Sequence, residues 1–128
     1  MKLFDELKYR GLINDVTSPQ LEEKLNNGGL TFYIGTDPTG DSLHIGHYSS
    51  LLCAKRLKEH GHHPIMLVGG ATGFIGDPKA SGERNMLTKE VLEHNYPCLS
   101  KQIEAQLGFG QVNNLDWHKD LSRIAFLR

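Results

Sequence analysis

Two short apolar runs separated by a single helical stretch constrain the fold of this chain most strongly. Residues 31–35, TFYIG, are rich in β-branched and aromatic side chains, and residues 64–68, PIMLV, form a second run of strand length. Between them, residues 46–60 have the apolar spacing of a helix, and Gly61 supplies a stop signal. The apolar stripe of this helix consists of Leu51, Leu52, Ala54 and Leu57. Two buried strands joined by one helix predict a parallel sheet with a right-handed crossover, the opening of a nucleotide-binding α/β fold.

Further helices are expected on both sides of this unit. Residues 3–10 are predicted to form a helix that ends at Gly11, and Ser18 with Pro19 opens a second short helix that ends at Gly28 and Gly29. After the second strand, residues 69–84 carry five glycines and no sustained period, which predicts a long loop.

The last third of the chain is predicted to contain one long helix and a third strand. The helix begins at Thr88, runs to about Leu107, and is expected to bend or break at Pro97. Its apolar positions are Val91, Leu92, Leu99, Ile103 and Leu107. Residues 111–113 are expected to form a third strand, and residues 121–128 to begin another helix.

The composition is that of one ordinary globular domain spanning residues 1–128. Hydrophobic residues make up 38%, and the 14 glycines bring this to about 49%, which excludes a disordered chain. Lys and Arg total 14 against 15 for Asp and Glu, so charge alone indicates no nucleic-acid partner. Cys53 and Cys98 show no CxxC spacing, as expected of reduced thiols.

No stretch of the sequence resembles a membrane span or a signal peptide. The longest uncharged apolar run, residues 64–76, is too short and too rich in glycine to cross a bilayer. The first ten residues mix charged and apolar side chains, unlike the uncharged core of a signal peptide. We therefore expect a cytoplasmic protein with no membrane partner.

The segment with most chemical information is residues 33–47, YIGTDPTGDSLHIGH, which joins the first strand to the crossover helix. Ligands of parallel α/β sheets bind at this edge, where a helix N-terminus offers unpaired N–H groups and a partial positive charge. Gly35, Gly40 and Gly46 allow a bulky ligand to approach the backbone. His44 and His47 share one helical face, so both can donate hydrogen bonds to one phosphate group.

Two other interpretations of the histidines stay open at this point. The pair can be a helix cap, or it can belong to a zinc site that also uses His60, His62 or His63. No cysteine cluster or HExxH spacing completes such a site, and the three later histidines lie at a helix end, where imidazoles suit the carbonyl dipole. We expect them to be structural and expect no protein-bound metal.

With these residues identified, the chain resembles the N-terminus of a tyrosyl-tRNA synthetase. The class I aminoacyl-tRNA synthetase signature His-Ile-Gly-His is present at residues 44–47, preceded by YIGTDPTGDSL and followed by LVGGATGFIGDP at residues 67–78. The resemblance extends from LFDELKYRGLI at residues 3–13 to VNNLDW at residues 112–117 and FLR at the end. It implies a Rossmann-like parallel sheet with flanking helices. Family members continue with a KMSKS loop, a dimer-forming segment and tRNA-binding domains, so the resemblance covers the first half of the catalytic domain.

The resemblance also implies a reaction. L-tyrosine and ATP, accompanied by Mg²⁺, give tyrosyl-adenylate and pyrophosphate, and tyrosine then passes to the 3′ end of tRNA(Tyr), in a protein that is a homodimer. The implied catalytic residues are His44 and His47. The implied ATP-binding residues are Gly35, Asp37, Pro38, Thr39, His44, Gly46, His47, Ser50 and Arg84. The implied tyrosine-binding residues are Tyr33, Gly35, Asp37 and Asp77.

Several of these roles have alternatives. Tyr33 can be a core aromatic rather than the partner of the substrate phenol, and Asp77 can serve a turn before Pro78. The sequence KASGER at residues 79–84 departs from the family's usual loop, so Arg84 keeps its motif position while Lys79 does not clearly do so. At the level of function, the alternatives are a catalytically silent fragment that binds ATP or tyrosine, and another nucleotidyltransferase with an HxGH motif.

Overall fold

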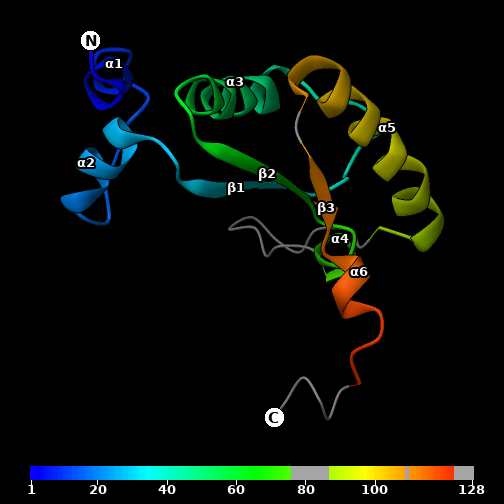
Figure 1. Ribbon diagram of the computed structural model, residues 1–128. Coiled ribbons are helices and arrows are strands. Elements are labelled where there is room, and N and C mark those ends of the chain that lie inside the picture. Colours follow the sequence, from blue (N-terminus) through cyan, green and yellow to red (C-terminus); the bar gives the residue numbers. More distant parts are fainter. Residues whose placement is uncertain (76–86, 109, 123–128) are drawn as a thin grey trace.

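A parallel three-stranded sheet organises the computed structural model, which describes residues 1–75, 87–108 and 110–122 (Figure 1). The strands are β1 (Thr31–Thr36), β2 (His63–Val68) and β3 (Gln111–Asn113), in the order β1-β2-β3. Residue Tyr33 is paired with Ile65, and Met66 is paired with Gln111. The predicted parallel sheet, its crossover helix and its third strand are confirmed.

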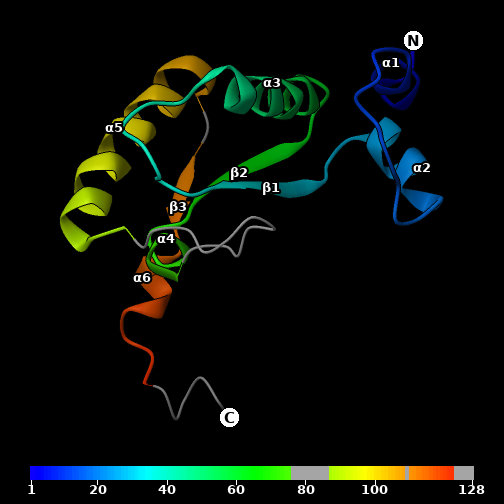
Figure 2. The same ribbon diagram turned by 180° about the vertical axis from the view of Figure 1, so that it is seen from behind.

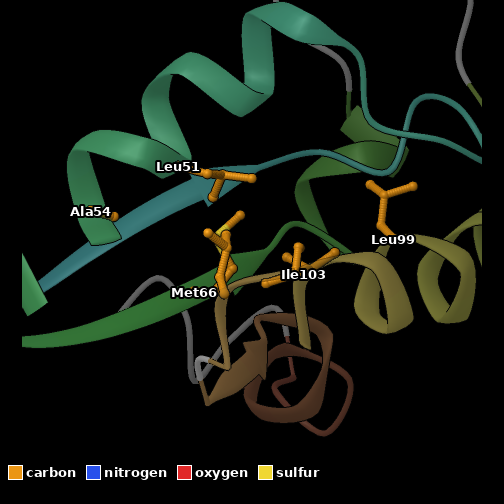
Figure 3. Close-up of a cluster of buried hydrophobic side chains, with 7 residues drawn as sticks. Leu51, Ala54, Met66, Leu99 and Ile103 are labelled. Atoms are coloured by element: carbon orange, nitrogen blue, oxygen red, sulfur yellow. The ribbon is translucent and has the colours of Figure 1, made fainter. Parts of the chain in front are cut away.

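Two long helices cover one face of this sheet. Helices α3 (Ile45–Glu59) and α5 (Lys89–Leu107) lie on the same side of the strands in both views (Figures 1 and 2). Their apolar side chains meet those of β2 in a single core, where Leu51 and Ala54 of α3 point toward Met66 and toward Leu99 and Ile103 of α5 (Figure 3). Val68 and Leu107 complete the cluster, and Phe32 and Ile34 pack against it.

The expectation that both strands are buried was wrong for β1. Its residues alternate between exposed and half-buried, and the side chain of Tyr33 is 71% exposed. The reason is that β1 is an edge strand of the described sheet, with only its Phe32 and Ile34 face against the core. Strand β2 lies between two strands and buries Met66 and Val68 completely, as expected for an inner strand.

Two short helices, α1 (Leu3–Tyr9) and α2 (Gln20–Asn27), lie beside the beginning of β1 (Figure 1). They begin and end close to the predicted positions, and Gly11 and Gly28 have the positive φ values, +68° and +76°, that helix ends commonly use. The buried imidazole of His62 connects α2 to the sheet. Its Nδ1 accepts from the Leu30 N–H at 3.2 Å, which leaves Nε2 to donate to the Leu25 carbonyl at 2.9 Å.

The N-terminal helix is also tied to α3 by charge. Glu6 accepts a hydrogen bond from Arg10 at 2.8 Å and lies 3.9 Å from both Arg56 and His60. The hydrogen bond from Arg10 is the main cause that lowers the pKa of Glu6. His60 further contacts the Arg56 carbonyl through Nδ1 at 2.9 Å. Both His60 and His62 thus have backbone partners at the ends of helices.

Helix α5 begins where Thr88 caps it, as predicted, with Thr88 Oγ1 accepting from the Val91 N–H at 3.4 Å. Of the predicted bend or break at Pro97, the break was wrong, because the helix runs through that residue as one element. Proline removes only the bond to the Glu93 carbonyl, and both residues are exposed to water that can hydrate it. The buried positions Leu92, Leu99 and Ile103, on either side of Pro97, hold both halves on the core.

Two one-turn helices differ from the prediction. Helix α4 (Thr72–Ile75) lies within the expected loop at residues 69–84, and α6 (Leu115–His118) begins one residue after the end of β3. Leu121 and Ser122 are not helical, and the remainder of the helix expected at residues 121–128 lies outside the described residues. No helix in the described ranges has the length and apolar character needed to cross a membrane.

Candidate functional site

The carboxyl end of β1 and the N-terminus of α3 border two adjoining hollows. The larger measures about 330 Å³ and is lined by Gly35, Thr36, Asp37, Thr39, His47, Leu67, Gly69, Thr72 and Asn114. The smaller measures about 180 Å³ and is lined by Ile34, Gly35, Thr36, Leu43, His44, Gly46, His47, Ser50, Leu51 and Met66. Gly35, Thr36 and His47 border both hollows, so one elongated ligand can contact the two together.

His44 and His47 cap the helix and keep one ring nitrogen each for a ligand. His44 Nδ1 accepts from the Gly46 N–H at 3.1 Å, and the His44 N–H donates to His47 Nδ1 at 3.2 Å. The two ring centroids lie 3.9 Å apart. Because both Nδ1 atoms accept hydrogen bonds, the proton of each neutral ring is on Nε2. The pair therefore offers two Nε2–H donors side by side at a helix N-terminus.

The electrostatics of the site favour a neutral His47. Partial burial is the main cause that lowers its pKa below the ordinary histidine value, and the neighbouring His44 ring lowers it further. A neutral ring is also what the cap requires, since a protonated Nδ1 cannot accept the bond from His44. The cap interpretation of the two histidines is thus confirmed, and the same hydrogen bonds leave their ligand role possible.

A polar network joins the ends of all three strands. Thr72 Oγ1, in α4, donates to Asp37 Oδ1 at 2.6 Å. The buried Asn114, which directly follows β3, donates from Nδ2 to Thr72 Oγ1 at 3.3 Å and accepts from the Ala71 N–H at 2.7 Å. These bonds fix the orientation of the Asp37 carboxylate at the larger hollow.

Two glycines after β2 make room for this network. A Cβ on Gly69 would overlap the Asp37 carboxylate and the Thr72 hydroxyl, and a Cβ on Gly70 would overlap the Asn113 side chain. The Gly70 N–H donates to Asn113 Oδ1 at 3.2 Å. Only residues without a side chain allow the backbone to pass so close to these polar groups.

The structure brings most of the predicted site residues together. Those that border the two hollows are Gly35, Asp37, Thr39, His44, Gly46, His47 and Ser50. Pro38 instead is buried and borders neither hollow. Tyr33 borders neither of these but a third hollow of about 480 Å³, lined by residues of β1 and α3, and Ser50 borders this one as well. Asp77, Lys79 and Arg84 lie outside the described residues.

Sequence reasoning missed the last residue of β1 and the residues in or just after β2, α4 and β3. Thr36, Leu67, Gly69, Thr72 and Asn114 border the larger hollow and were not among the predicted residues. A usable signal was present, because GG follows the second predicted strand and NN ends the third. The carboxyl ends of neighbouring parallel strands meet at one sheet edge, so polar and small residues there belong with the first strand's turn.

The sequence of this chain matches a known protein family. Residues 25–128 match the family described as tRNA synthetases class I (W and Y). The chain is 54% identical to tyrosine-tRNA ligase 2 of Streptococcus thermophilus and 45% identical to tyrosine-tRNA ligase of Corynebacterium diphtheriae, in both cases over its whole length. It spans 42% of the first protein and 32% of the second.

A solved structure has a similar fold. The C-terminally truncated mitochondrial tyrosyl-tRNA synthetase of Aspergillus nidulans matches 99% of this chain and 41% of its own, with a TM-score of 0.79 and 24% sequence identity. This likeness agrees with the predicted Rossmann-like sheet with flanking helices. With the family match extending from α2 to the last residue, the chain belongs to the class I tRNA synthetases of the tryptophan and tyrosine type.

Proposed function

We propose that this chain is the ATP- and tyrosine-binding part of a tyrosine-tRNA ligase. The observation that carries the proposal is the arrangement of His44 and His47, whose shared cap leaves two Nε2–H donors beside the hollows at the end of β1. The 54% and 45% identical relatives, both tyrosine-tRNA ligases, support the choice of tyrosine over tryptophan.

The chemistry needs charge stabilisation more than a protein nucleophile. A carboxylate oxygen of tyrosine attacks the α-phosphorus of ATP, the bond from that phosphorus to the bridging oxygen breaks, and pyrophosphate leaves. Negative charge spreads over the phosphate oxygens as the new bond forms. Neutral imidazoles that donate through Nε2, together with the N-terminus of α3, stabilise this charge without a proton transfer.

The nucleotide lies along the β1 to α3 turn in this proposal. Gly35 and Gly46 let it approach the backbone, and Thr39 and Ser50 offer hydroxyl groups at the borders of the two hollows. Because Pro38 is buried, its proposed role is to fix the conformation of the turn rather than to contact the nucleotide. Arg84 is proposed to contact the phosphates.

Tyrosine is proposed to lie on the exposed side of the sheet. Tyr33 and Gly35 are two residues apart on β1 and so face the same side, which places the Tyr33 phenol where it can meet a substrate hydroxyl. Asp77 is the proposed partner of the substrate ammonium group, a charge-assisted hydrogen bond. The Asp37 carboxylate, held by Thr72, can accept a hydrogen bond from the ammonium group or from the nucleotide.

Mg²⁺ enters this reaction with ATP as part of the substrate. Asp37 is the carboxylate that borders the hollows, and its Oδ1 already accepts from Thr72. Within the described ranges no group of three or more His, Cys, Asp or Glu side chains is placed to hold a metal ion. In this proposal the ATP phosphates are the main ligands of Mg²⁺, as is usual for nucleotide-bound magnesium.

The wider features of the ligase reaction belong to the same proposal. The activated tyrosine is transferred to tRNA(Tyr), and the working protein is a homodimer in the cytoplasm. Cys53 and Cys98 are both unpaired, which suits a reducing compartment.

Amino-acid-dependent exchange of pyrophosphate into ATP tests the proposal. We expect exchange with tyrosine but not with phenylalanine or tryptophan, and loss of it in His47→Ala. Exchange that does not depend on tyrosine would contradict the proposal and would favour another nucleotidyltransferase. Binding of ATP and tyrosine without any exchange would identify this chain as a silent binding unit.

A further inference from the structure

We propose that Asn95 and Gln102 of α5 are positioning residues that hold the ATP-binding turn, residues 37–44, in its working geometry. This inference rests on the proposed function for its catalytic consequence. We call the two residues the α5 clamp. Neither of them borders a hollow of the site, and both reach the turn from a helix more than fifty residues further along the chain.

Asn95 holds the beginning of the turn. Its side chain is buried, and Nδ2 donates to the Pro38 carbonyl at 2.9 Å. Pro38 is itself among the most completely buried residues of the chain. Because Pro38 directly follows Asp37, this bond fixes the backbone next to the carboxylate that Thr72 orients.

Gln102 holds the end of the turn. Its Oε1 accepts from the Leu43 N–H at 2.8 Å, and its Nε2 donates to Ser42 Oγ at 3.0 Å. Leu43 directly precedes His44, the residue that caps α3. A shift of Leu43 therefore moves the cap and the two imidazoles that depend on it.

The two anchors form one rigid unit. Asn95 and Gln102 are seven residues apart, about two turns of helix, so they project from the same face of α5. The buried Leu99 lies between them on that face and packs in the core. The helix therefore fixes the distance between Asn95 and Gln102, and the packing of Leu99 in the core holds the helix in place. It follows that α5 fixes the separation between Asp37 at one end of the turn and His44 at the other.

The polar character of the clamp is not explained by packing alone. The buried carboxamide of Asn95 must be hydrogen-bonded, and an apolar side chain of similar size often serves stability equally well at such a position. What the carboxamides add is a fixed position for three specific backbone and hydroxyl groups of the turn. Positioning of reacting groups within a fraction of an ångström is a large part of catalysis.

The test compares Gln102→Met with Gln102→Glu in the complete protein. Methionine keeps the size but loses both hydrogen bonds, whereas glutamate keeps an acceptor for the Leu43 N–H. Gln106→Met is the matched control, because Gln106 is exposed one turn further along α5. Pyrophosphate exchange would give KM for ATP, KM for tyrosine and kcat, and thermal unfolding would give Tm.

We expect Gln102→Met to lower kcat/KM for ATP about tenfold, the loss that one or two hydrogen bonds produce. KM for tyrosine should stay within twofold, and Gln102→Glu should recover part of the loss. A merely structural role would lower Tm without separating ATP from tyrosine and without rescue by glutamate. That result, or unchanged kinetics in Gln102→Met, would overturn the proposal.

A second measurement is independent of activity. The ring-nitrogen NMR signals of His44 and His47 should move in Gln102→Met and in Asn95→Ala but not in Gln106→Met, because only the first two changes release the turn. Unmoved signals would overturn the clamp. If the unchanged protein shows no pyrophosphate exchange, the ligase function fails, and the NMR comparison still decides whether the clamp holds the turn.

Discussion

The backbone N–H of His44 donates to Nδ1 of His47 at 3.2 Å, and the two rings lie with their centroids 3.9 Å apart. In each imidazole Nδ1 therefore accepts a hydrogen bond from the backbone, and the proton of the neutral ring is on Nε2. Capping the helix and the proposed binding of a phosphate are therefore compatible roles for the same two residues. The cap fixes the proton of each neutral ring on Nε2, the nitrogen that the proposed ligand would contact.

Substitutions at His44 should separate its role in capping α3 from its proposed role in binding ATP. Asparagine is a good helix cap but has no group in the place of Nε2–H, so His44→Asn should keep Tm within about 2 °C of the unchanged protein and weaken ATP binding about tenfold. His44→Ala should weaken ATP binding equally and also destabilise the fold by about 1 kcal/mol. Calorimetric titration and thermal unfolding measure the two effects. Equal ATP affinity in His44→Asn and the unchanged protein would assign His44 to the cap alone.

The lowered pKa of His47 predicts how stability depends on pH. Burial is its main cause, so the folded chain takes up a proton at His47 only below the ordinary value of about 6.5. As pH falls through 6.5, the unfolded chain binds this proton first, and the free energy of unfolding therefore decreases until the folded ring is protonated as well. Above about pH 7.5 this contribution is fully present.

Thermal unfolding of the unchanged protein and of His47→Gln between about pH 5 and pH 8 isolates this effect. The difference in Tm should favour the unchanged protein most at the alkaline end and shrink toward the acid end. An NMR titration that placed the pKa of His47 above 6.5 would contradict the prediction directly.

Gly69 is predicted to be intolerant of any side chain. In Gly69→Ala the added methyl group meets the Asp37 carboxylate and the Thr72 hydroxyl, and either must move. We expect a loss of about 1–3 kcal/mol in the free energy of unfolding, together with weaker binding of ATP. Gly110→Ala is the control, because nothing lies within 4 Å of the Cβ that it adds. If chemical denaturation gave the same stability for both variants, the close packing of Gly69 against the network would be refuted.

Tyr33→Phe is expected to change selectivity without changing stability. The Tyr33 side chain is 71% exposed, so removal of its hydroxyl should leave Tm unaltered. In the proposed site the hydroxyl meets the substrate phenol, and the preference for tyrosine over phenylalanine should narrow when it is lost. Pyrophosphate exchange with each amino acid gives the ratio. A ratio identical to that of the unchanged protein would remove Tyr33 from the specificity pocket.

The local part of the fold could be predicted because its signals are local. The glycines at positions 11, 28 and 61 end helices with positive φ, and Thr88 caps α5, as the sequence indicates. The strand-helix-strand unit follows from the apolar runs at β1 and β2. Features that depend on how distant segments pack against one another were predicted less well. The exposure of β1 depends on its place at the sheet edge, and the continuity of α5 through Pro97 depends on core contacts on both sides of it.

The candidate site shows the same division. Most of the site residues between Gly35 and Ser50 were found because one continuous segment carries them, although Thr36 was missed. Thr72 and Asn114 were missed because their role exists only once three strand ends meet, and a hydrogen bond between residues 42 positions apart has no periodic signature in a sequence. The outcome for Asp77 and Arg84 lies outside the described residues, and their roles stay predictions.

The long separation between the turn and its supports also has a consequence for synthesis. Residues 37–44 leave the ribosome well before Asn95, Gln102 and Asn114, which later hold the turn and its carboxylate in place. During that interval the signature histidines are already translated but lack the framework that spaces them. A nascent chain that has passed residue 47 but not yet residue 114 should therefore contain the proposed nucleotide motif and still bind nucleotide poorly, so that binding arises only after Asn114 has been added.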